Sequence, residues 1–368
     1  MTSNPKKSLS YTSVGVDTDA ASVGLSGLLY WVKQTLEYRR GVGEPLVPIG
    51  FFASVVRLAD DLSLAISTDG VGSKSVVAQL VGQFDGIGED CVAVNVNDVI
   101  CTGAEPLGML DYISLEAPHP ELLEQLGRGL QRGALQSQIA IVGGELSQHP
   151  DTLAGPRPGY AFDIAGTAFG LLRKQEPITG ASVRPGDVIL GLGSNGIHCN
   201  GLTLARHVLL GEESQGISEY VDELGCTIGE ELLRPTRIYS KEVMMLLQEG
   251  IDIRGLAHIS GDGLLNLTRL DSPVSYAITD LPEIPPIFEL IRQKGDVGLA
   301  EMYRVFNMGI GFCIVLKESQ AKEALAILKS QNGDVQVIGK VVDDNTRTVF
   351  LPEYQIAGRD GHFTVLPK

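Results

Sequence analysis

Apolar runs of strand length alternate with segments of helical periodicity along most of this chain, and this alternation constrains its fold more than any other feature. Residues 62–68 (LSLAIST) indicate a strand, and residues 88–102 carry apolar side chains at helical spacing. A polar segment at 174–187, with two prolines and two glycines, interrupts the pattern before it resumes. We therefore predict a mixed α/β protein with two domains, residues 1–177 and residues 178–368.

The other expected elements follow from the same patterns. Strands are predicted at residues 107–115, 139–142, 160–172, 188–192, 256–259, 311–316 and 335–341. Helices are predicted at residues 75–84, 120–136, 201–210, 235–248 and 319–330. Strands and helices thus recur on both sides of the polar segment, as expected for two α/β domains.

The charge and cysteine content exclude several classes of function. The 368 residues carry a net charge of -16 without a long run of lysine or arginine, so we expect no nucleic-acid partner. No apolar run approaches the roughly 18 residues of a membrane span, and residues 1–10 form a polar lead-in rather than a signal peptide. Five cysteines without a C-x-x-C pair suit reduced thiols, which predicts a cytoplasmic protein that does not associate with membranes.

The segment TDGVGSK at 68–74 carries the clearest chemical signal in the chain. A predicted strand ends here in a carboxylate, Asp69, and Mg²⁺ prefers such oxygen ligands. Gly70 and Gly72 let backbone amides approach phosphate oxygens closely, and the ammonium group of Lys74 matches a phosphate. The alternative is a simple strand-to-helix turn in which the aspartate caps the helix.

Two further segments place oxygen ligands beside apolar elements. Asn95, Asp98 and Thr102 share one polar face of an otherwise apolar helix, so a buried carboxylate there needs a partner such as a hard cation. Glu145 follows two glycines at the end of a predicted strand. We predict that Asp69, Asp98 and Glu145 bind a metal ion. The alternatives are a helix surface facing water and a loop glutamate.

Two histidines lie beside glycine-rich turns in the second half of the chain. Residues 191–196 match G-x-G-x-x-G, but the next helix is expected only at residue 201, which is late for a dinucleotide-binding unit. We instead expect this loop to deliver His198 and Asn200 to a helix N-terminus, where an anion binds readily. His258 precedes a second glycine turn and is predicted to meet a phosphate or the substrate. The alternatives are structural histidines and, for the first loop, a dinucleotide-dependent oxidoreductase.

Together these motifs resemble those of one enzyme family, the phosphoribosylformylglycinamidine cyclo-ligases, also called aminoimidazole ribonucleotide synthetases. The resemblance spans nearly the whole chain in order. Besides the segments described above, it rests on GVD at 15–17, VNDVI at 96–100, GAEP at 103–106, VGGE at 142–145, RPTRIY at 234–239 and EMYRVFNMGIG at 301–311.

The resemblance implies an N-terminal domain of mixed sheet and helices that pairs with its twin in a homodimer, a C-terminal α/β domain, and ATP in the cleft between the domains. It implies a small-molecule substrate, formylglycinamidine ribonucleotide. The γ-phosphate of ATP would activate its formamide oxygen, and an amidine nitrogen would then close the imidazole ring. The products would be aminoimidazole ribonucleotide, ADP and phosphate.

The resemblance also implies roles for the candidate residues, with ATP and Mg²⁺ as cofactors. The metal and ATP would be met by Asp69, Asn95, Asp98 and Glu145. The phosphates would be met by Gly70, Gly72 and Lys74. The substrate would be met by the predicted catalytic residues His198, Asn200 and His258.

Several positions depart from the residues that are usual in this family. The glycine-glycine-glutamate motif continues as LSQHP at 146–150, Ile197 and Cys199 flank the loop histidine, and Asp262 stands where a glycine is usual. These changes bear on the substrate rather than on the fold. The alternative function is therefore an ATP-binding paralogue that is non-catalytic or has a different specificity.

Overall fold

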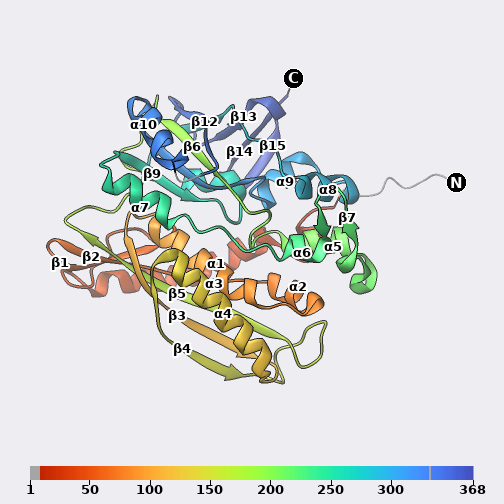
Figure 1. The fold of residues 1–368 in the computed structure, drawn as a ribbon. Coiled ribbons are helices and arrows are strands. Elements are labelled where there is room, and N and C mark those ends of the chain that lie inside the picture. Colours follow the sequence, from red (N-terminus) through yellow and green to blue (C-terminus); the bar gives the residue numbers. More distant parts are fainter. Residues whose placement is uncertain (1–8, 331–332, 368) are drawn as a thin grey trace.

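The computed structural model describes residues 9–330 and 333–367, so most of the predicted lead-in lies outside the described residues. Figure 1 shows a lower, N-terminal half and an upper, C-terminal half, each built around a β-sheet. The first sheet has the strand order β1-β2-β5-β3-β4. Its strands are β1 (Ser54–Ala59), β2 (Leu62–Gly70), β3 (Glu105–Leu115), β4 (Ala140–Gln148) and β5 (Phe162–Arg173).

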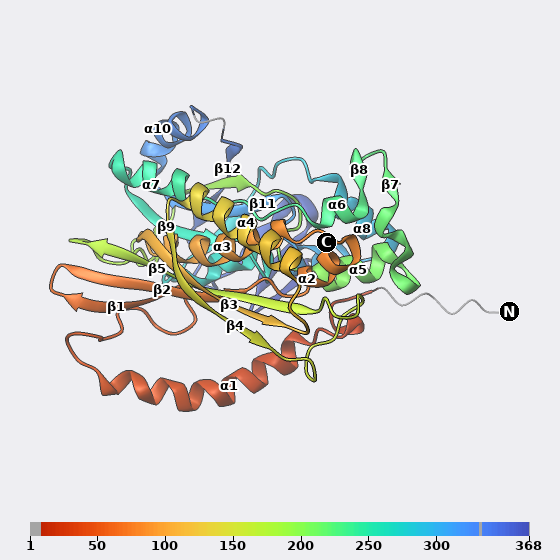
Figure 2. The ribbon, with the colours of Figure 1, turned by 60° about the horizontal axis from the view of Figure 1, so that its bottom comes forward.

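Helices lie on both sides of this first sheet. On one side, α3 packs against β2 and β5, and α4 packs on α3. Figure 2 shows α1 on the opposite side of the sheet. The helical segments of this half are η1 (Thr12–Val14), α1 (Thr18–Gln34), η2 (Thr35–Tyr38), α2 (Lys74–Val81), α3 (Asp85–Ile100) and α4 (Pro120–Ser137). The helices predicted at 75–84, 88–102 and 120–136 are therefore confirmed, apart from their ends.

The strand predicted at 139–142 is longer than expected. It continues to Gln148 as β4, because it pairs in parallel with β3 along that whole length. The two glycines and Glu145 therefore lie within a strand at the edge of the sheet and do not end it. The predicted end of the strand at these glycines is wrong, since the pairing with β3 overrides the weak strand preference of glycine.

Helices α3 and α4 approach each other more closely than side chains would allow. A Cβ atom at Gly88 would lie 2.2 Å from the carbonyl oxygen of Leu126, and one at Gly129 would lie 1.8 Å from that of Asp85. These two positions accept only glycine unless the helices move apart. The close contact holds α3 firmly in place, and α3 carries two of the predicted site residues.

We expect Gly129→Ala to lower the free energy of unfolding by about 1–3 kcal/mol, because the new methyl group would collide with the backbone of α3. For Gly127→Ala, two residues earlier on the same helix, we expect the free energy of unfolding to rise. Its Cβ would meet nothing within 4 Å, so the better helix propensity of alanine would stabilise the protein by up to about 1 kcal/mol. Urea denaturation of both variants measures the two signs, and equal effects would contradict the packing argument.

The second sheet has the strand order β15-β14-β13-β10-β12-β6-β11-β9. Its strands are β6 (Val188–Gly193), β9 (Ile253–His258), β10 (Ser275–Ile278), β11 (Ile310–Leu316), β12 (Val335–Val342), β13 (Val349–Leu351), β14 (Ile356–Arg359) and β15 (His362–Val365). A small separate ribbon is formed by β7 (Tyr220–Val221) and β8 (Cys226–Thr227). The helical segments are α5 (Leu202–Leu210), η3 (Glu212–Ser218), α6 (Ile228–Leu232), α7 (Ser240–Gln248), η4 (Gly263–Arg269), α8 (Pro286–Gly295), α9 (Leu299–Val305), α10 (Glu318–Lys329) and η5 (Pro352–Tyr354).

Strand β6, which leads into the G-x-G-x-x-G loop, runs antiparallel to both of its neighbours, β11 and β12. A dinucleotide-binding βαβ unit requires parallel strands joined by a helix. The loop therefore does not belong to such a unit, and the alternative of a dinucleotide-dependent oxidoreductase loses its only support.

The helix predicted at 235–248 begins only at Ser240, and residues 234–239 before it form neither helix nor strand. The cause is a tertiary contact with α3. The backbone N–H and the hydroxyl of Thr236 both donate to Asp90 Oδ1, at 2.7 and 2.6 Å. The buried carboxylate of Asp90 thus accepts a hydrogen bond from a backbone amide that a helix would orient differently. This contact links the segment before α7 to α3.

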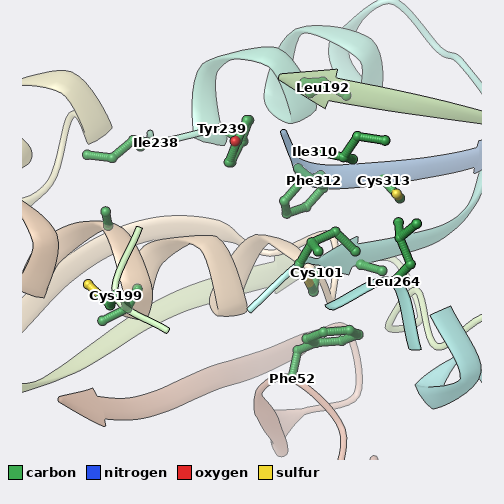
Figure 3. Close-up of a cluster of buried hydrophobic side chains, with 14 of the residues drawn as sticks. Phe52, Cys101, Leu192, Cys199, Ile238, Tyr239, Leu264, Ile310, Phe312 and Cys313 are labelled. Carbon is green, nitrogen blue, oxygen red and sulfur yellow. The ribbon is translucent and has the colours of Figure 1, made fainter. Parts of the chain in front are cut away.

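Buried side chains of both halves meet in one hydrophobic core (Figure 3). Phe52 and Cys101 come from the N-terminal half, and Leu192, Leu264 and Phe312 come from the C-terminal half. A shared core fixes how the halves sit against each other, so residues at their junction have a defined geometry. Among the residues that the structure describes, no helix combines the length and apolar character needed to cross a bilayer.

Candidate active site

The end of β2 is clamped to α3 by one buried amide. Asn95 Oδ1 accepts a hydrogen bond from the backbone N–H of Asp69 at 2.9 Å, and Asn95 Nδ2 donates to the carbonyl oxygen of Asp69 at 3.1 Å. Asn95 Nδ2 also donates to the carbonyl oxygen of Cys91. Its polar atoms are thus engaged with the protein, so Asn95 positions Asp69, and its predicted contact with a nucleotide stays a prediction.

Asp69 and Asp98 form a carboxylate pair next to this clamp. The pKa of Asp69 is raised, first because the surrounding protein desolvates its carboxyl group and second because the negative charge of Asp98 is close. Two such carboxylates repel each other, and a hard divalent cation would relieve both the repulsion and the desolvation. The donor chemistry therefore fits Mg²⁺ at these two of the three predicted ligands.

Asp98 also joins the two halves of the chain. Its Oδ1 atom lies 2.9 Å from Nδ1 of His258, at the end of β9, and the hydroxyl of Ser67 donates to its Oδ2 atom at 3.5 Å. The His258 side chain is only 3% exposed. A carboxylate at Nδ1 fixes the orientation of an imidazole and leaves Nε2 for proton transfer. The sequence placed these two residues in separate roles, and the structure brings them together.

Glu145 does not join Asp69 and Asp98. In the sheet, Gly70 pairs with Ala165, Ala165 with Tyr112 and Tyr112 with Glu145. Three strand spacings of about 4.8 Å separate Glu145 from β2, a distance of roughly 14 Å. Over residues 9–330 and 333–367, no group of three or more histidine, cysteine, aspartate or glutamate side chains could hold a metal ion. The predicted three-carboxylate site is therefore not formed within one chain.

Lys74 lies in the protein interior. Its side chain is fully buried, and its ammonium group lies 2.8 Å from Asp90 Oδ2 and donates to the carbonyl oxygen of Arg234. A phosphate would have to displace a buried ion pair to reach it, which is costly. In this arrangement Asp90 is the charged partner of Lys74, and the predicted contact of Lys74 with phosphate stays a prediction. That prediction was made from the motif alone. The sequence around Lys74 does not indicate that Asp90, 16 residues away, is its partner.

The glycine turn itself remains exposed at the predicted place. Gly72 has a φ of 66°, a left-handed conformation that favours glycine. Gly70 has no such requirement and lies within the strand β2. The hydroxyl of Ser73 is 3.0 Å from that of Thr203 in the first turn of α5. The turn therefore borders the start of α5, where the loop carrying His198 and Asn200 ends.

His198 lies in the interior. Its backbone is left-handed, with a φ of 65°, and its Nε2 atom accepts a hydrogen bond from the backbone N–H of Asn195 at 3.1 Å. Burial, and then the nearby charge of His258, holds the pKa of His198 well below its usual value. The ring is therefore neutral and shapes its own loop. His198 also lines a small cavity together with His258, and its predicted contact with substrate stays a prediction.

This burial makes stability depend on pH. The folded pKa of His198 is depressed, so the unfolded chain binds the proton more readily below its own pKa of about 6.5. The stabilising effect is present above that pH and is lost as pH falls, by up to about 1.4 kcal/mol per pH unit. In His198→Gln, the side-chain oxygen can accept the same hydrogen bond, but the side chain does not titrate. The free energy of unfolding of this variant should therefore change less steeply with pH, by the contribution of one proton. Urea denaturation between pH 7.5 and pH 5 measures it, and identical slopes would contradict the assignment.

Asn200 is exposed and lines a cavity of about 160 Å³ together with Tyr11, Asp262 and Arg304. Its amide thus stands at the predicted place beside the start of α5. The sequence predictions did not include Tyr11 or Arg304 among the site residues. Arg304 lies within the segment 301–311 that carries the resemblance, and this was the available signal.

Comparisons with known proteins identify the family of this chain. The chain matches "AIR synthase related protein, N-terminal domain" over residues 52–172 and "AIR synthase related protein, C-terminal domain" over residues 184–351. It is 44% identical over 341 residues to a phosphoribosylformylglycinamidine cyclo-ligase of Methanobrevibacter smithii, covering 93% of this chain and 97% of the relative. It is 45% identical over 337 residues to that of Thermococcus kodakarensis, covering 91% and 96%.

Solved structures share the fold at lower identity. A HypE–HypF complex matches with a TM-score of 0.60 and 19% identity, over 85% of this chain and 92% of that one. AaThiL complexed with AMPPCP and TMP matches with a TM-score of 0.59 and 19% identity, over 88% and 92%. These similarities concern the fold alone. The similarity to the curated relatives extends over nearly the whole chain, and on that basis the chain belongs to the phosphoribosylformylglycinamidine cyclo-ligase family.

Proposed function

We propose that this enzyme converts formylglycinamidine ribonucleotide and ATP into 5-aminoimidazole ribonucleotide, ADP and phosphate, a ligase reaction of purine biosynthesis. The observation that carries the proposal is the 44% identity, over 93% of the chain, to a relative named for this reaction. The convergence of Asp69, Asp98 and His258 at the junction of the two halves supports it. Structural neighbours solved with ATP or AMPPCP support the use of ATP.

In this proposal, Asp69 and Asp98 would hold Mg²⁺, which neutralises charge on the phosphates of bound ATP. The formamide oxygen of the substrate attacks the γ-phosphate, and ADP leaves. The amidine nitrogen then attacks the activated carbon, and phosphate leaves as the ring closes. His258, held at Nδ1 by Asp98, is our candidate for moving a proton at Nε2 during ring closure.

We also propose a homodimer formed through the first sheet. Its strands β3 and β4 carry exposed apolar side chains, which are Leu110, Tyr112, Val142 and Leu146, between 44% and 59% exposed. Exposed apolar side chains on neighbouring strands favour a protein partner. Glu145 lies on the same strand, so a role in ATP or metal binding would bring it to a site shared with the second copy. Sedimentation equilibrium would give the mass of a dimer if this holds.

Two smaller proposals concern organisation and location. We place the domain boundary after residue 177, in the segment between β5 and β6, because residues 173–183 lie outside both matched family regions. We propose a cytoplasmic location, since all five cysteine thiols are free and four of them are buried, which suits a reducing compartment.

The test measures ADP release from Mg-ATP with and without formylglycinamidine ribonucleotide, together with the diazo-coupled colour of aminoimidazole ribonucleotide. Equal amounts of ADP and coloured product, formed only with substrate, are expected. Release of ADP without substrate, or the absence of coloured product, would contradict the proposed function and leave the family membership standing.

A further inference from the structure

Polar side chains from four distant parts of the chain surround a cavity of about 160 Å³ beside the start of α5. They come from the N-terminal segment, the loop before α5, the turn after β9, and α9. The groups that matter here are Tyr11, Thr18, Asn200, Gly261, Asp262 and Arg304. Asn200 also lines the small cavity that contains His258, so the larger cavity adjoins the Asp98–His258 pair.

The N-terminal segment is tied across this cavity. The backbone N–H of Tyr11 donates to Glu301 Oε1 at 2.8 Å, and Arg304 Nη1 donates to the hydroxyl of Thr18 at 3.1 Å. Arg304 is itself oriented by Glu301, to which Nε donates at 2.8 Å. Contacts between residues almost 300 positions apart thus build one wall of the cavity and place a guanidinium group in it.

Asp262 contributes the opposite charge. It has a φ of 71°, a left-handed conformation that aspartate tolerates, and the following Gly263 is pinned against the carbonyl oxygen of Tyr303, which a Cβ would approach to 2.2 Å. The turn therefore presents the carboxylate in a fixed place. Within residues 9–330 and 333–367, no hydrogen bond or ion pair engages this carboxylate, although the charges of Arg269, Arg304 and His362 are near.

A carboxylate that a rigid turn presents to a cavity without a protein partner suits a ligand that donates hydrogen bonds. Vicinal hydroxyl groups of a ribose are such donors, and acidic side chains recognise them in other nucleotide sites. A neighbouring guanidinium suits the phosphate attached to such a sugar. The volume is below the ~300 Å³ of pockets for whole drug-sized ligands, so it matches one part of a nucleotide.

We propose that this cavity binds the ribose of a ribonucleotide and that Asp262 selects ribose over deoxyribose by accepting hydrogen bonds from its hydroxyl groups. The proposal rests on the proposed function, in which both reactants, ATP and formylglycinamidine ribonucleotide, carry a ribose. The ribose is common to both reactants, and the experiment below distinguishes which of the two binds in the cavity.

The test uses Asp262→Gly, because glycine adopts a φ of 71° without strain and the turn should persist. Loss of hydrogen bonds to a charged acceptor should raise the KM of one of the two ribonucleotides roughly 10- to 100-fold with little change in kcat. Wild type should discriminate against the 2′-deoxy form of that same ribonucleotide, and the variant should not. The reactant whose KM and deoxy discrimination both change is the one that occupies the cavity.

Asp360→Gly is the matched control. Asp360 is also an exposed, left-handed aspartate, with a φ of 52°, and it lies outside the lining of the proposed cavity. Its substitution makes the same change in charge and backbone freedom and should leave both KM values unchanged. If Asp262→Gly melts early, Asp262→Asn replaces it, since that change keeps the size of the side chain and removes its charge.

Unchanged KM values for both ribonucleotides in the Asp262 variant, with deoxy discrimination intact, would overturn the proposal. Should wild type show no turnover, the proposed function fails, and the cavity is still tested by calorimetry with ATP, 2′-deoxy-ATP and ribose 5-phosphate. Weaker binding of ATP or of ribose 5-phosphate by the variant than by wild type would then support the ribose site. Equal binding of all three by both proteins would overturn it.

Discussion

Asp69→Asn should reduce Mg-dependent turnover about 1,000-fold and, at the same time, raise the melting temperature of the ligand-free protein. The loss reflects the removal of one of two carboxylates proposed to hold the metal, for which several kcal/mol of transition-state stabilisation is typical. The gain in stability has a separate cause. Because the pKa of Asp69 is raised by desolvation and by Asp98, its ionised form destabilises the folded state at neutral pH. Since Asp69 is exposed, solvent screening keeps this effect small. That cost arises as pH rises through the folded pKa, and asparagine avoids it.

The two readouts are steady-state turnover at saturating Mg-ATP and differential scanning calorimetry without ligand. Asp60→Asn is the control, because Asp60 is exposed at the turn between β1 and β2 in the same sheet. It makes the same charge change and should alter neither quantity. Wild-type turnover in Asp69→Asn would contradict the metal assignment, and a lower melting temperature would contradict the repulsion between the two carboxylates.

Lys74→Met should lower the free energy of unfolding by about 3–5 kcal/mol, the usual effect of removing one partner of a buried ion pair. Lys74 and Asp90 are both fully buried, with 2.8 Å between Nζ and Oδ2. Asp90 would keep its hydrogen bonds from Thr236 but would lose its counter-charge. The double variant Lys74→Met/Asp90→Leu should recover part of the loss, since no uncompensated charge remains.

Urea denaturation measures these differences, and Lys294→Met is the matched control. Lys294 pairs with Glu219 at 3.2 Å on the surface, and exposed pairs contribute at most about 1 kcal/mol. The experiment also separates the two roles considered for Lys74. Unchanged stability combined with lost ATP binding would restore the phosphate role that the motif predicted.

The sequence alone was sufficient for the features that depend on local patterns. The helix at 85–100 and the strand at 62–70 follow from periodicity over neighbouring residues. The ordered motifs identified the family, because many short segments matched in the same order. The left-handed Gly72 was likewise predictable, since few other residues tolerate that conformation.

Only the tertiary structure decided which partner each polar group has. The motif predicted that Lys74 binds phosphate, whereas in the structure it pairs with the buried Asp90. Asp98 and His258 are 160 residues apart in the sequence, and the packing of the two halves brings them together. Glu145 lies far from Asp69 and Asp98 because β4 is the edge strand of the sheet, three strands away from β2. The physical reason is the same in each case. Periodicity and turn chemistry act over a few residues, whereas burial and pairing depend on elements that the chain brings together from far apart.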